Sequence, residues 1–353
     1  MVNWFILAIV LCLSFLFTGL MRRYAIERHL MDMPNSRSSH DVPTPIGGGL
    51  AIVFCFLSAL SYCYLIGYVQ NPTFNSLFIG GLLVAGIGYW DDHRHIPVKL
   101  RILVHFSVAA WVLFQFGGLP DLRFGQFVWD MGRTGDLFGI IALVWLLNLY
   151  NFMDGIDGIA GVETISALLG ATFILLVNGN AHDSFLLMIL VAASLGFLIW
   201  NWPPAKIFMG DAGSGFLGFV LGVFALHTAS AESLSLWCWV ILLAVFLVDA
   251  TCTLLRRILR GDRFYEAHRS HAYQYLSLKL QQKNVLKGMS SVKARARGHY
   301  FVILCVAGIN IFWLFPLALV VSVRPELGVY LACIAMIPLV VVVIKLGAGK
   351  KSV

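Results

Sequence analysis

The sequence contains little charge. Asp, Glu, Lys and Arg make up 12% of its 353 residues, hydrophobic residues make up 59%, and the mean hydropathy is +0.83. A chain of this composition cannot cover a soluble domain of this length with polar side chains, so a soluble protein is excluded. We predict an all-α, polytopic integral membrane protein, in which a single multi-pass domain extends over residues 1–353.

The chain also lacks any cysteine spacing typical of a metal site, and it lacks internal repeats and low-complexity tracts. Its net charge of +7 does not indicate a nucleic-acid partner, because cytoplasmic loops that face anionic lipid and phosphate explain such a charge in a membrane protein. The seven cysteines all fall in apolar runs, and we interpret them as small core residues: Cys12, Cys55, Cys63, Cys238, Cys252, Cys305 and Cys333.

Eleven apolar runs are long enough for membrane-spanning helices. The first lacks basic residues before it and a cleavage site after it, and Arg22 and Arg23 follow it, so we expect a retained helix and not a signal peptide. The one long loop, 257–298, holds a predicted basic interfacial helix at 272–286. The runs are 2–21, 46–68, 76–90, 101–117, 136–150, 158–178, 184–200, 212–230, 234–256, 299–322 and 327–346.

The distribution of lysine and arginine predicts the orientation of the chain. With the N-terminus outside, the loops on the inner side hold 22 of the 25 basic residues, as cytoplasmic loops do. This orientation places the C-terminus and one set of polar residues on the cytoplasmic side: Asp91, Asp92, Asp154, Asp157, Asp211, His268 and His271. Carboxylates beside lipid persist mainly where they bind ions, protons or substrates, so we expect a metal-assisted active site on that side.

Asp91 and Asp92 are adjacent at the end of an apolar run. Two neighbouring carboxylates repel each other unless a cation or a shared proton intervenes. Mg²⁺ prefers one or two protein carboxylates together with phosphate oxygens, which favours a metal site here. The alternative is a solvated loop pair beside Arg94 and Lys99.

Asn148, Asn151, Asp154 and Asp157 follow one another at three-residue intervals. Residues three apart share a helix face, so the first three form one polar stripe at the end of an apolar helix. Two glycines in the same motif let the backbone approach a ligand closely. The alternative, in which these residues only cap two helices across a turn, explains one carboxylate but not four aligned polar side chains.

The segment 201–215 combines Asn201, Lys206, Phe208 and Asp211 with three glycines. We expect Asp211 to open the next helix, whose N-terminal N–H groups suit a phosphate. Phe208 is a candidate for stacking on a base, and Lys206 for meeting a phosphate charge. The alternative is a small-residue helix-packing motif led by an N-cap aspartate.

Three further features carry weaker signals. His268, Arg269 and His271 follow the ninth run, and histidines there bind metal, donate to phosphate or simply lie on the surface. Asp249, inside that run, either pairs with a nearby arginine or belongs to the site. The loop 34–49 is basic, rigid and glycine-terminated, which suits a lid over phosphate, and an ordinary linker is the alternative.

The motifs Pro-Thr-Pro-Ile-Gly-Gly-Gly, Asp-Asp, Asn-x-x-Asn-Phe-Met-Asp-Gly-Ile-Asp-Gly and Phe-Met-Gly-Asp-Ala-Gly-Ser, followed by a His-containing loop, occur in this order. The set resembles the polyprenyl-phosphate N-acetylhexosamine-1-phosphate transferases, glycosyltransferase family 4, over residues 20–275. The resemblance implies a phosphoglycosyltransferase of the bacterial inner membrane. It would transfer a sugar 1-phosphate from a UDP-N-acetylhexosamine to undecaprenyl phosphate and release UMP, with Mg²⁺ or Mn²⁺ as cofactor. A His-Arg-Ser-His segment, in place of three consecutive histidines, favours the branch that initiates O-antigen synthesis.

The resemblance also implies roles for individual residues. Asp211 matches the metal-binding aspartate, Asp91 and Asp92 match the pair near the metal and the lipid phosphate, and Phe208 matches the aromatic residue that stacks on uracil. The predicted catalytic residues are Asp91, Asp92, Asp154, Asp157, His268 and His271; the substrate-binding residues are Asn148, Asn151, Asn201, Lys206, Phe208 and Arg269; and the metal ligands are Asp211 and Asp92.

The expected reaction brings two phosphate-bearing anions together at the membrane surface, so Mg²⁺ and basic side chains must screen their charges. We expect direct attack of the lipid phosphate on the β-phosphorus, with one residue of the Asp91–Asp92 pair taking the proton. A covalent phosphosugar intermediate is the alternative mechanism. A cation- or proton-coupled transporter is the alternative function, although transporters usually hold their carboxylates near the midplane and show repeated halves. The donor sugar is not determined, and a homodimer is left open.

Overall fold

A segment inside a bilayer must satisfy its own backbone polar groups, and an α-helix does so. The computed structural model describes residues 4–34, 42–94, 96–262 and 269–350, which are almost entirely helical. The helices are α1 (Trp4–Glu27), α2 (Gly49–Leu65), α3 (Asn71–Asn75), α4 (Gly81–His93), α5 (Val98–Phe116), α6 (Gly132–Met153), α7 (Ile159–Val177), α8 (Ala181–Asn201), α9 (Asp211–Ser230), α10 (Leu236–Leu242), α11 (Ala244–Leu259), α12 (Ala272–Leu286), α13 (Ser291–Ile309), α14 (Phe315–Val323) and α15 (Gly328–Leu346). Short irregular helices are η1 (Ser76–Gly80), η2 (Asn310–Leu314) and η3 (Pro325–Leu327), and two antiparallel pairs join β1 (Met31–Asp32) to β2 (Thr44–Pro45) and β3 (Leu122–Phe124) to β4 (Phe127–Trp129).

The predicted all-α, polytopic class is confirmed. Nine helical segments among the described residues are long and apolar enough to cross a membrane, and counting the bent pair α10–α11 as one span makes ten. The helix α2 is apolar but has only 17 residues. Ten of the predicted runs overlap these ten segments, and the remaining run, 46–68, overlaps α2. The count of eleven spans stays a prediction. All seven cysteines are free, but only Cys55, Cys63 and Cys238 are buried, so the interpretation as core residues is wrong for the exposed Cys12 and Cys333.

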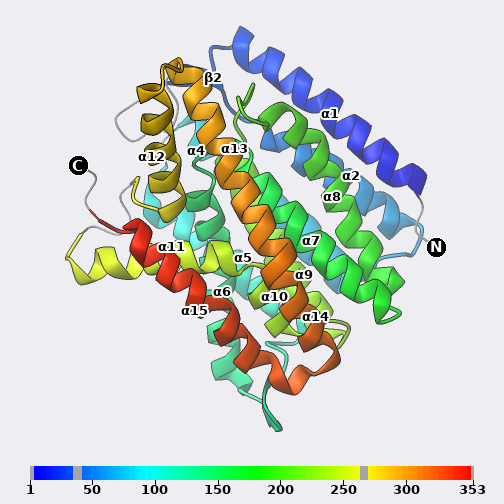
Figure 1. The fold of residues 1–353 in the computed structure, drawn as a ribbon. Coiled ribbons are helices and arrows are strands. Elements are labelled where there is room, and N and C mark those ends of the chain that lie inside the picture. The colour runs from blue at the N-terminus through cyan, green and yellow to red at the C-terminus, as the bar shows by residue number, and fades with distance from the viewer. Residues whose placement is uncertain (1–3, 35–41, 95, 263–268, 351–353) are drawn as a thin grey trace.

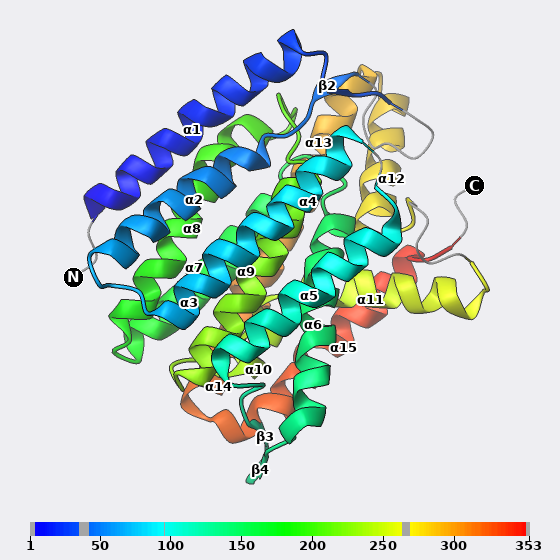
Figure 2. The ribbon, with the colours of Figure 1, turned by 180° about the vertical axis from the view of Figure 1, so that it is seen from behind.

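Two segments differ in shape from the prediction. The run 234–256 is not one helix, because α10 and α11 meet at 74° and α11 leaves the bundle sideways (Figures 1 and 2). Neither proline nor glycine lies at this break, so the usual backbone causes of a kink do not explain it. The long loop is also shorter than predicted, because α13 already begins at Ser291.

The polar segments gather at two opposite ends of the bundle. The end that is uppermost in Figure 1 holds β2, the last turn of α4, α12 and the start of α13, whereas the opposite end holds β3, β4 and α14. The segments predicted to be cytoplasmic therefore share one end. The helix α12 lies where the sequence predicts a helix, but its buried residues are Ala272, Tyr273, Gln274 and Ser277, which do not form an apolar stripe.

The helix α9 is central, since most of its residues are buried. Glycines let its neighbours approach its backbone closely: a Cβ atom on Gly88 of α4 would lie 2.7 Å from the backbone of Ala212. On the other side, a Cβ atom on Gly218 of α9 would lie 2.7 Å from the carbonyl oxygen of Leu146 in α6. These contacts bring the polar ends of α4, α6 and α9 together.

We expect Gly88→Ala to lower the unfolding temperature and the activity. Its methyl group meets the α9 backbone, and overpacking of this kind costs about 1–3 kcal/mol. Gly86→Ala, on the same helix, is the matched control, because a Cβ atom there meets nothing within 4 Å. Thermal unfolding in detergent compares the two variants, and equal unfolding temperatures would contradict the close packing of α4 on α9.

Candidate active site

Four aspartates from three helix ends lie close together, and we call them the carboxylate cluster: Asp91, Asp92, Asp154 and Asp211. Two end α4, one directly follows α6 and one begins α9. The pKa of Asp154 is well above its ordinary range, because burial and the negative charges of Asp211, Asp157 and Asp92 disfavour its ionised form. The structure therefore brings together carboxylates that are up to 120 residues apart in the sequence.

The carboxylate of Asp92 holds the start of α9. One oxygen accepts a hydrogen bond from the backbone N–H of Asp211 at 2.9 Å, and the other accepts one from Ala212 at 3.3 Å. The first N–H groups of a helix have no partner within the helix, and negative charge is favourable beside them. Asp92 thus connects the end of α4 to the helix that Asp211 opens.

Arg101, in the first turn of α5, compensates part of the negative charge. One of its terminal nitrogens lies 2.6 Å from Asp91 and 3.7 Å from Asp211. Asp91 also accepts a hydrogen bond from the N–H of Ile96 at 3.0 Å. Arg101 was not predicted as a site residue, since it counted only among the basic residues that orient the chain. Its position at the start of a span, soon after an Asp-Asp pair, was the available signal.

Beneath this ion pair, two predicted substrate-binding residues line a small polar cavity. Asn148 and Asn151 share it with Arg101, His105 and Asp211, and its volume of about 10 Å³ is near the lower limit for one water molecule. Asn148 lies 3.3 Å from the ring nitrogen of His105, and Asn151 donates to the hydroxyl of a serine on α9 at 3.4 Å. The predicted polar stripe therefore faces the α9 end of the cluster.

Asp157 faces α13 instead of the cluster. Its carboxylate lies 3.2 Å from the ring of His299 and accepts the N–H of Ala205 at 3.1 Å. Burial raises the pKa of Asp157, but the hydrogen bond and charge of His299, the N–H of Ala205 and the charge of Arg295 outweigh it and hold that pKa below its ordinary value. His299 was missed in the sequence, where it appears only as the first residue of an apolar run.

The segment before α9 is held by backbone contacts. Asn201 is buried, accepts the N–H of Gly158 at 2.8 Å and donates to the carbonyl of Ile207 at 2.9 Å, so it braces two loops. The ammonium of Lys206 lies 5.5 Å from the centre of the Trp200 ring.

Phe208 is half-buried in the same segment, and its backbone pairs with the early glycine-rich loop. Its N–H donates to Pro45, and its carbonyl accepts from Gly48. The C-terminal part of the predicted lid, from residue 42, therefore lies beside the start of α9. Residues 35–41 of that loop lie outside the described residues.

The histidine segment is described only from Arg269 onward, so His268 lies outside the described residues. Arg269 is half-buried, and His271 is buried directly before α12. The ring of His271 lies 3.3 Å from Asp249 of α11. The same carboxylate accepts the first N–H groups of α12, including that of Tyr273 at 3.1 Å.

Tyr273 places α12 on the loop that carries Asp154. Its hydroxyl donates to the carbonyl of Phe152 at 3.2 Å, and a Cβ atom on Gly155 would collide with that hydroxyl. Tyr273 was not predicted as a site residue. Asp249 therefore acts on the site through the start of α12.

The residues present fit a magnesium ion. Mg²⁺ takes oxygen ligands and usually one or two protein carboxylates, with water and substrate phosphates completing its shell. No group of three or more His, Cys, Asp or Glu side chains in the described ranges is arranged as a complete metal site. Asp92 and Asp211 nevertheless lie near enough for their carboxylates to repel each other, and Mg²⁺ usually takes one or two carboxylates from the protein.

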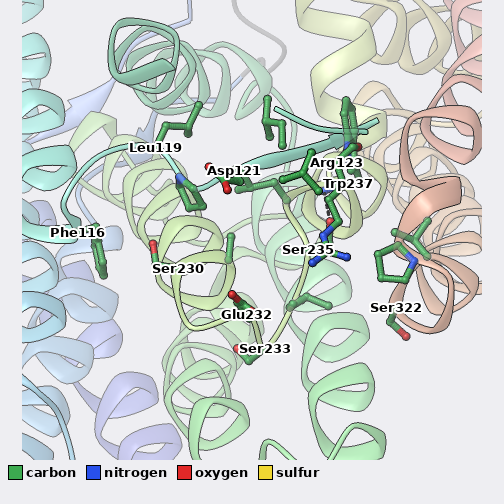
Figure 3. A pocket seen from close by; sticks show the side chains of 18 of the residues that line it. Phe116, Leu119, Asp121, Arg123, Ser230, Glu232, Ser233, Ser235, Trp237 and Ser322 are labelled. Carbon is green, nitrogen blue, oxygen red and sulfur yellow. Dashed lines mark hydrogen bonds between the residues drawn. The ribbon is translucent and has the colours of Figure 1, made fainter. Parts of the chain in front are cut away.

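A second concavity, drawn in Figure 3, is lined by residues of β3 and of the start of α10, and β3 lies at the end of the bundle opposite to β2 (Figure 2). Its volume is about 500 Å³, and Asp121, Arg123, Glu232 and Trp237 are among the residues that line it. No predicted site residue lines this cavity.

The fold and the site together define a multi-pass membrane protein with an acidic, partly arginine-compensated site at one end of an apolar helix bundle. Comparison with known sequences supports one family. Residues 74–229, which include the whole carboxylate cluster, match the model of glycosyl transferase family 4. This match and the similar proteins described next support the family that the order of its motifs predicted.

The relatives have consistent names. The chain is 28% identical over 264 residues to a probable undecaprenyl-phosphate N-acetylglucosaminyl 1-phosphate transferase of Bacillus subtilis (strain 168), with 73% of each chain covered. It is 28% identical over 282 residues to the undecaprenyl-phosphate alpha-N-acetylglucosaminyl 1-phosphate transferase of Escherichia coli (strain K12), with 74% of each covered. The Salmonella typhi protein of that name is 27% identical over 272 residues, covering 73% of this chain and 72% of its own. The predicted enzyme class, a phosphoglycosyltransferase, is confirmed.

We expect Asp157→Asn to lower the unfolding temperature at neutral pH, with a difference from the wild type that disappears in acid. Because the folded-state pKa of Asp157 is lowered, its charge stabilises the fold fully above the unfolded-state pKa of about 3.9. This contribution is lost as the pH falls through the lower, folded-state value. Thermal unfolding of both proteins between neutral pH and about pH 2 measures it. A difference that persists in acid would contradict the role of this charge.

Proposed function

We propose that this protein transfers an N-acetylhexosamine 1-phosphate from a UDP-sugar to undecaprenyl phosphate and releases UMP. The observation that carries the proposal is the carboxylate cluster at the end of an apolar bundle, with Arg101 between Asp91 and Asp211. The names of the relatives make UDP-N-acetylglucosamine the first donor to test.

The charges of the site suit this reaction. Both substrates are anions, and Arg101 supplies a positive charge within 4 Å of two of the carboxylates. We propose that Asp92 and Asp211 hold Mg²⁺, which when bound screens phosphate charge. Asp91, held toward Arg101, then takes the proton of the lipid phosphate. An oxygen of that phosphate attacks the β-phosphorus of the donor and forms a new P–O bond. The bond between the β-phosphorus and the bridging oxygen breaks, and UMP leaves with its electron pair.

The two substrates approach from different sides of the cluster in this proposal. The nucleotide lies toward Asp154 and its loop, which Tyr273 covers, with Phe208 as the residue for stacking on uracil. The lipid phosphate lies toward the end of α4, because exposed aromatic residues, Tyr89 and Trp90, precede the aspartate pair there. Aromatic residues of this kind are enriched where a membrane meets water.

The excess of basic residues in loops at this end supports a cytoplasmic location for the site. We propose a multi-pass protein of the bacterial inner membrane, with its N-terminus in the periplasm and its C-terminus in the cytoplasm. Its product would initiate the synthesis of O-antigen or a related cell-envelope glycan.

The reaction is tested by UMP release from purified protein with undecaprenyl phosphate, Mg²⁺ and a panel of UDP-N-acetylhexosamines. We expect one donor to give UMP only when lipid and Mg²⁺ are both present. Asp211→Asn should lower the rate by about a hundredfold or more, as expected when charge stabilisation at the reacting phosphate is lost.

Asp121→Asn is the control for the loss of a carboxylate, because Asp121 lines the cavity at the opposite end. It should leave the rate unchanged. No UMP from any donor, with protein shown to be folded, would contradict the proposal, and uptake assays would then test the transporter alternative.

Arg101→Gln is expected to lower kcat/KM by about tenfold to a hundredfold. A hydrogen bond to a charged group contributes about 1.5–3 kcal/mol, which corresponds to this range of rates. Arg94→Gln is the matched control, since Arg94 is exposed in the same connection between α4 and α5. Equal effects of the two variants would mean that Arg101 contributes only general positive charge.

A further inference from the structure

Glu163 is a fully buried carboxyl group that the proposed reaction does not use. It lies in the second turn of α7, shortly after Asp157 in the chain, and its exposed fraction is 0%. An ionisable side chain inside a membrane bundle is costly and usually has a function. Its partners show what that function is.

The first partner is Asn310 of η2, whose amide nitrogen donates to one oxygen of Glu163 at 2.7 Å. The segment η2 is a single π-helical turn between α13 and α14, and such turns are frequent at functional positions. The other side-chain oxygen of each residue is buried, and neither finds a hydrogen-bond partner among the residues described. Buried oxygens without partners are rare and costly, so stability alone does not explain this pair.

Both α7 and η2 also contact α10, and the backbone N–H of Phe246 lies near enough to the Glu163 carboxyl group to interact with its charge. Phe246 lies in the first turn of α11, directly after the 74° break from α10. The first N–H groups of a helix need acceptors outside that helix, and a carboxyl group is a favourable one. Glu163 therefore places an acidic side chain beside the first N–H groups of α11, at a break that no proline or glycine explains.

The direction of α11 matters for the site. About one turn beyond Phe246, Asp249 accepts the N–H groups of Ala272 and Tyr273 at 3.0 and 3.1 Å and so fixes the start of α12. Tyr273 in turn donates to the carbonyl of Phe152, two residues before Asp154. A change in the angle at the break moves Asp249, and with it the helix that covers the carboxylate cluster.

We propose that Glu163 and Asn310 are positioning residues that hold the break between α10 and α11 and thereby hold α12 over the loop of Asp154. They contact the protein and not the substrates. The inference rests on the proposed function for its effect on rate, but its structural part is independent of that function.

The test compares variants of the full-length protein. Glu163→Leu and Asn310→Leu remove the pair, and we expect each to lower kcat/KM by about tenfold to a hundredfold, the cost of displacing a site by a small distance. Glu163→Gln keeps the shape of the side chain and an oxygen that accepts from Asn310. Its amide nitrogen adds a donor for the unpaired oxygen of Asn310, so this variant should retain activity close to that of the wild type. Thr172→Val is the matched control, because Thr172 is buried on the same helix and its hydroxyl has no partner among the described residues.

The second readout is amide hydrogen exchange. Both leucine variants should exchange faster at residues 272–275, while α8 exchanges as in the wild type. If Glu163→Leu does not fold, Asn310→Leu carries the same test.

Unchanged exchange at 272–275, or equally faster exchange throughout the bundle, would overturn the inference, as would a Glu163→Gln variant as impaired as Glu163→Leu. If the wild type releases no UMP, the proposed function fails by itself, and the exchange result still decides the role of the pair.

Discussion

The hydrogen bonds from the start of α9 to the carboxylate of Asp92 are the interaction on which the site depends. The first N–H groups of a helix have no partner within the helix and need acceptors from elsewhere in the structure. Asp92 supplies the acceptors from the end of α4. Gly88 allows the approach that this contact needs, since any side chain there would meet the backbone of α9. Once α4 and α9 are joined in this way, Asp91 and Asp211 are close enough for Arg101 to reach both.

The polar residues at this end of the bundle divide into two groups with different surroundings. One group forms the carboxylate cluster, in which negative charges crowd one another and a cation is favourable. The other group braces the loops around it: Asp157 is paired with His299, and Asn201 connects two loops through backbone hydrogen bonds. Both kinds of residue are expected in a site that must bring two anions together, because charge alone attracts the substrates but only fixed loops orient them.

The helix α11 relates the site to the interior of the bundle. Its lateral course makes Asp249 available to α12, so that a short helix outside the bundle is held by a residue from inside it. The break that produces this course coincides with the buried carboxyl group of Glu163. The polar groups inside the bundle thus support the same end of the molecule as those at its surface.

Much of this protein was predictable from local pattern. Apolar runs located the helices that are long and apolar enough to cross a membrane, because burial in lipid selects hydrophobic residues directly. The three-residue spacing from Asn148 to Asp154 placed polar side chains on one helix face. The helix at 272–286 was also located, because the four-residue spacing of its lysines is a local pattern, although its buried residues do not form the expected apolar stripe. The motif order identified the family that the comparisons then supported.

What only the tertiary structure decided were the pairings between distant segments. Tyr273 and His299 become parts of the site through contacts with Phe152 and Asp157 that no local pattern marks. Arg101 does so through Asp91, and its place soon after an Asp-Asp pair was the one local signal. The bend at the start of α11 was missed because no proline or glycine in its own residues marks it. Sequence pattern determines which segments enter the membrane and which side chains are polar, because these depend on solvation. The packing of the helices determines which polar groups meet, because that depends on backbone distances that no single segment sets.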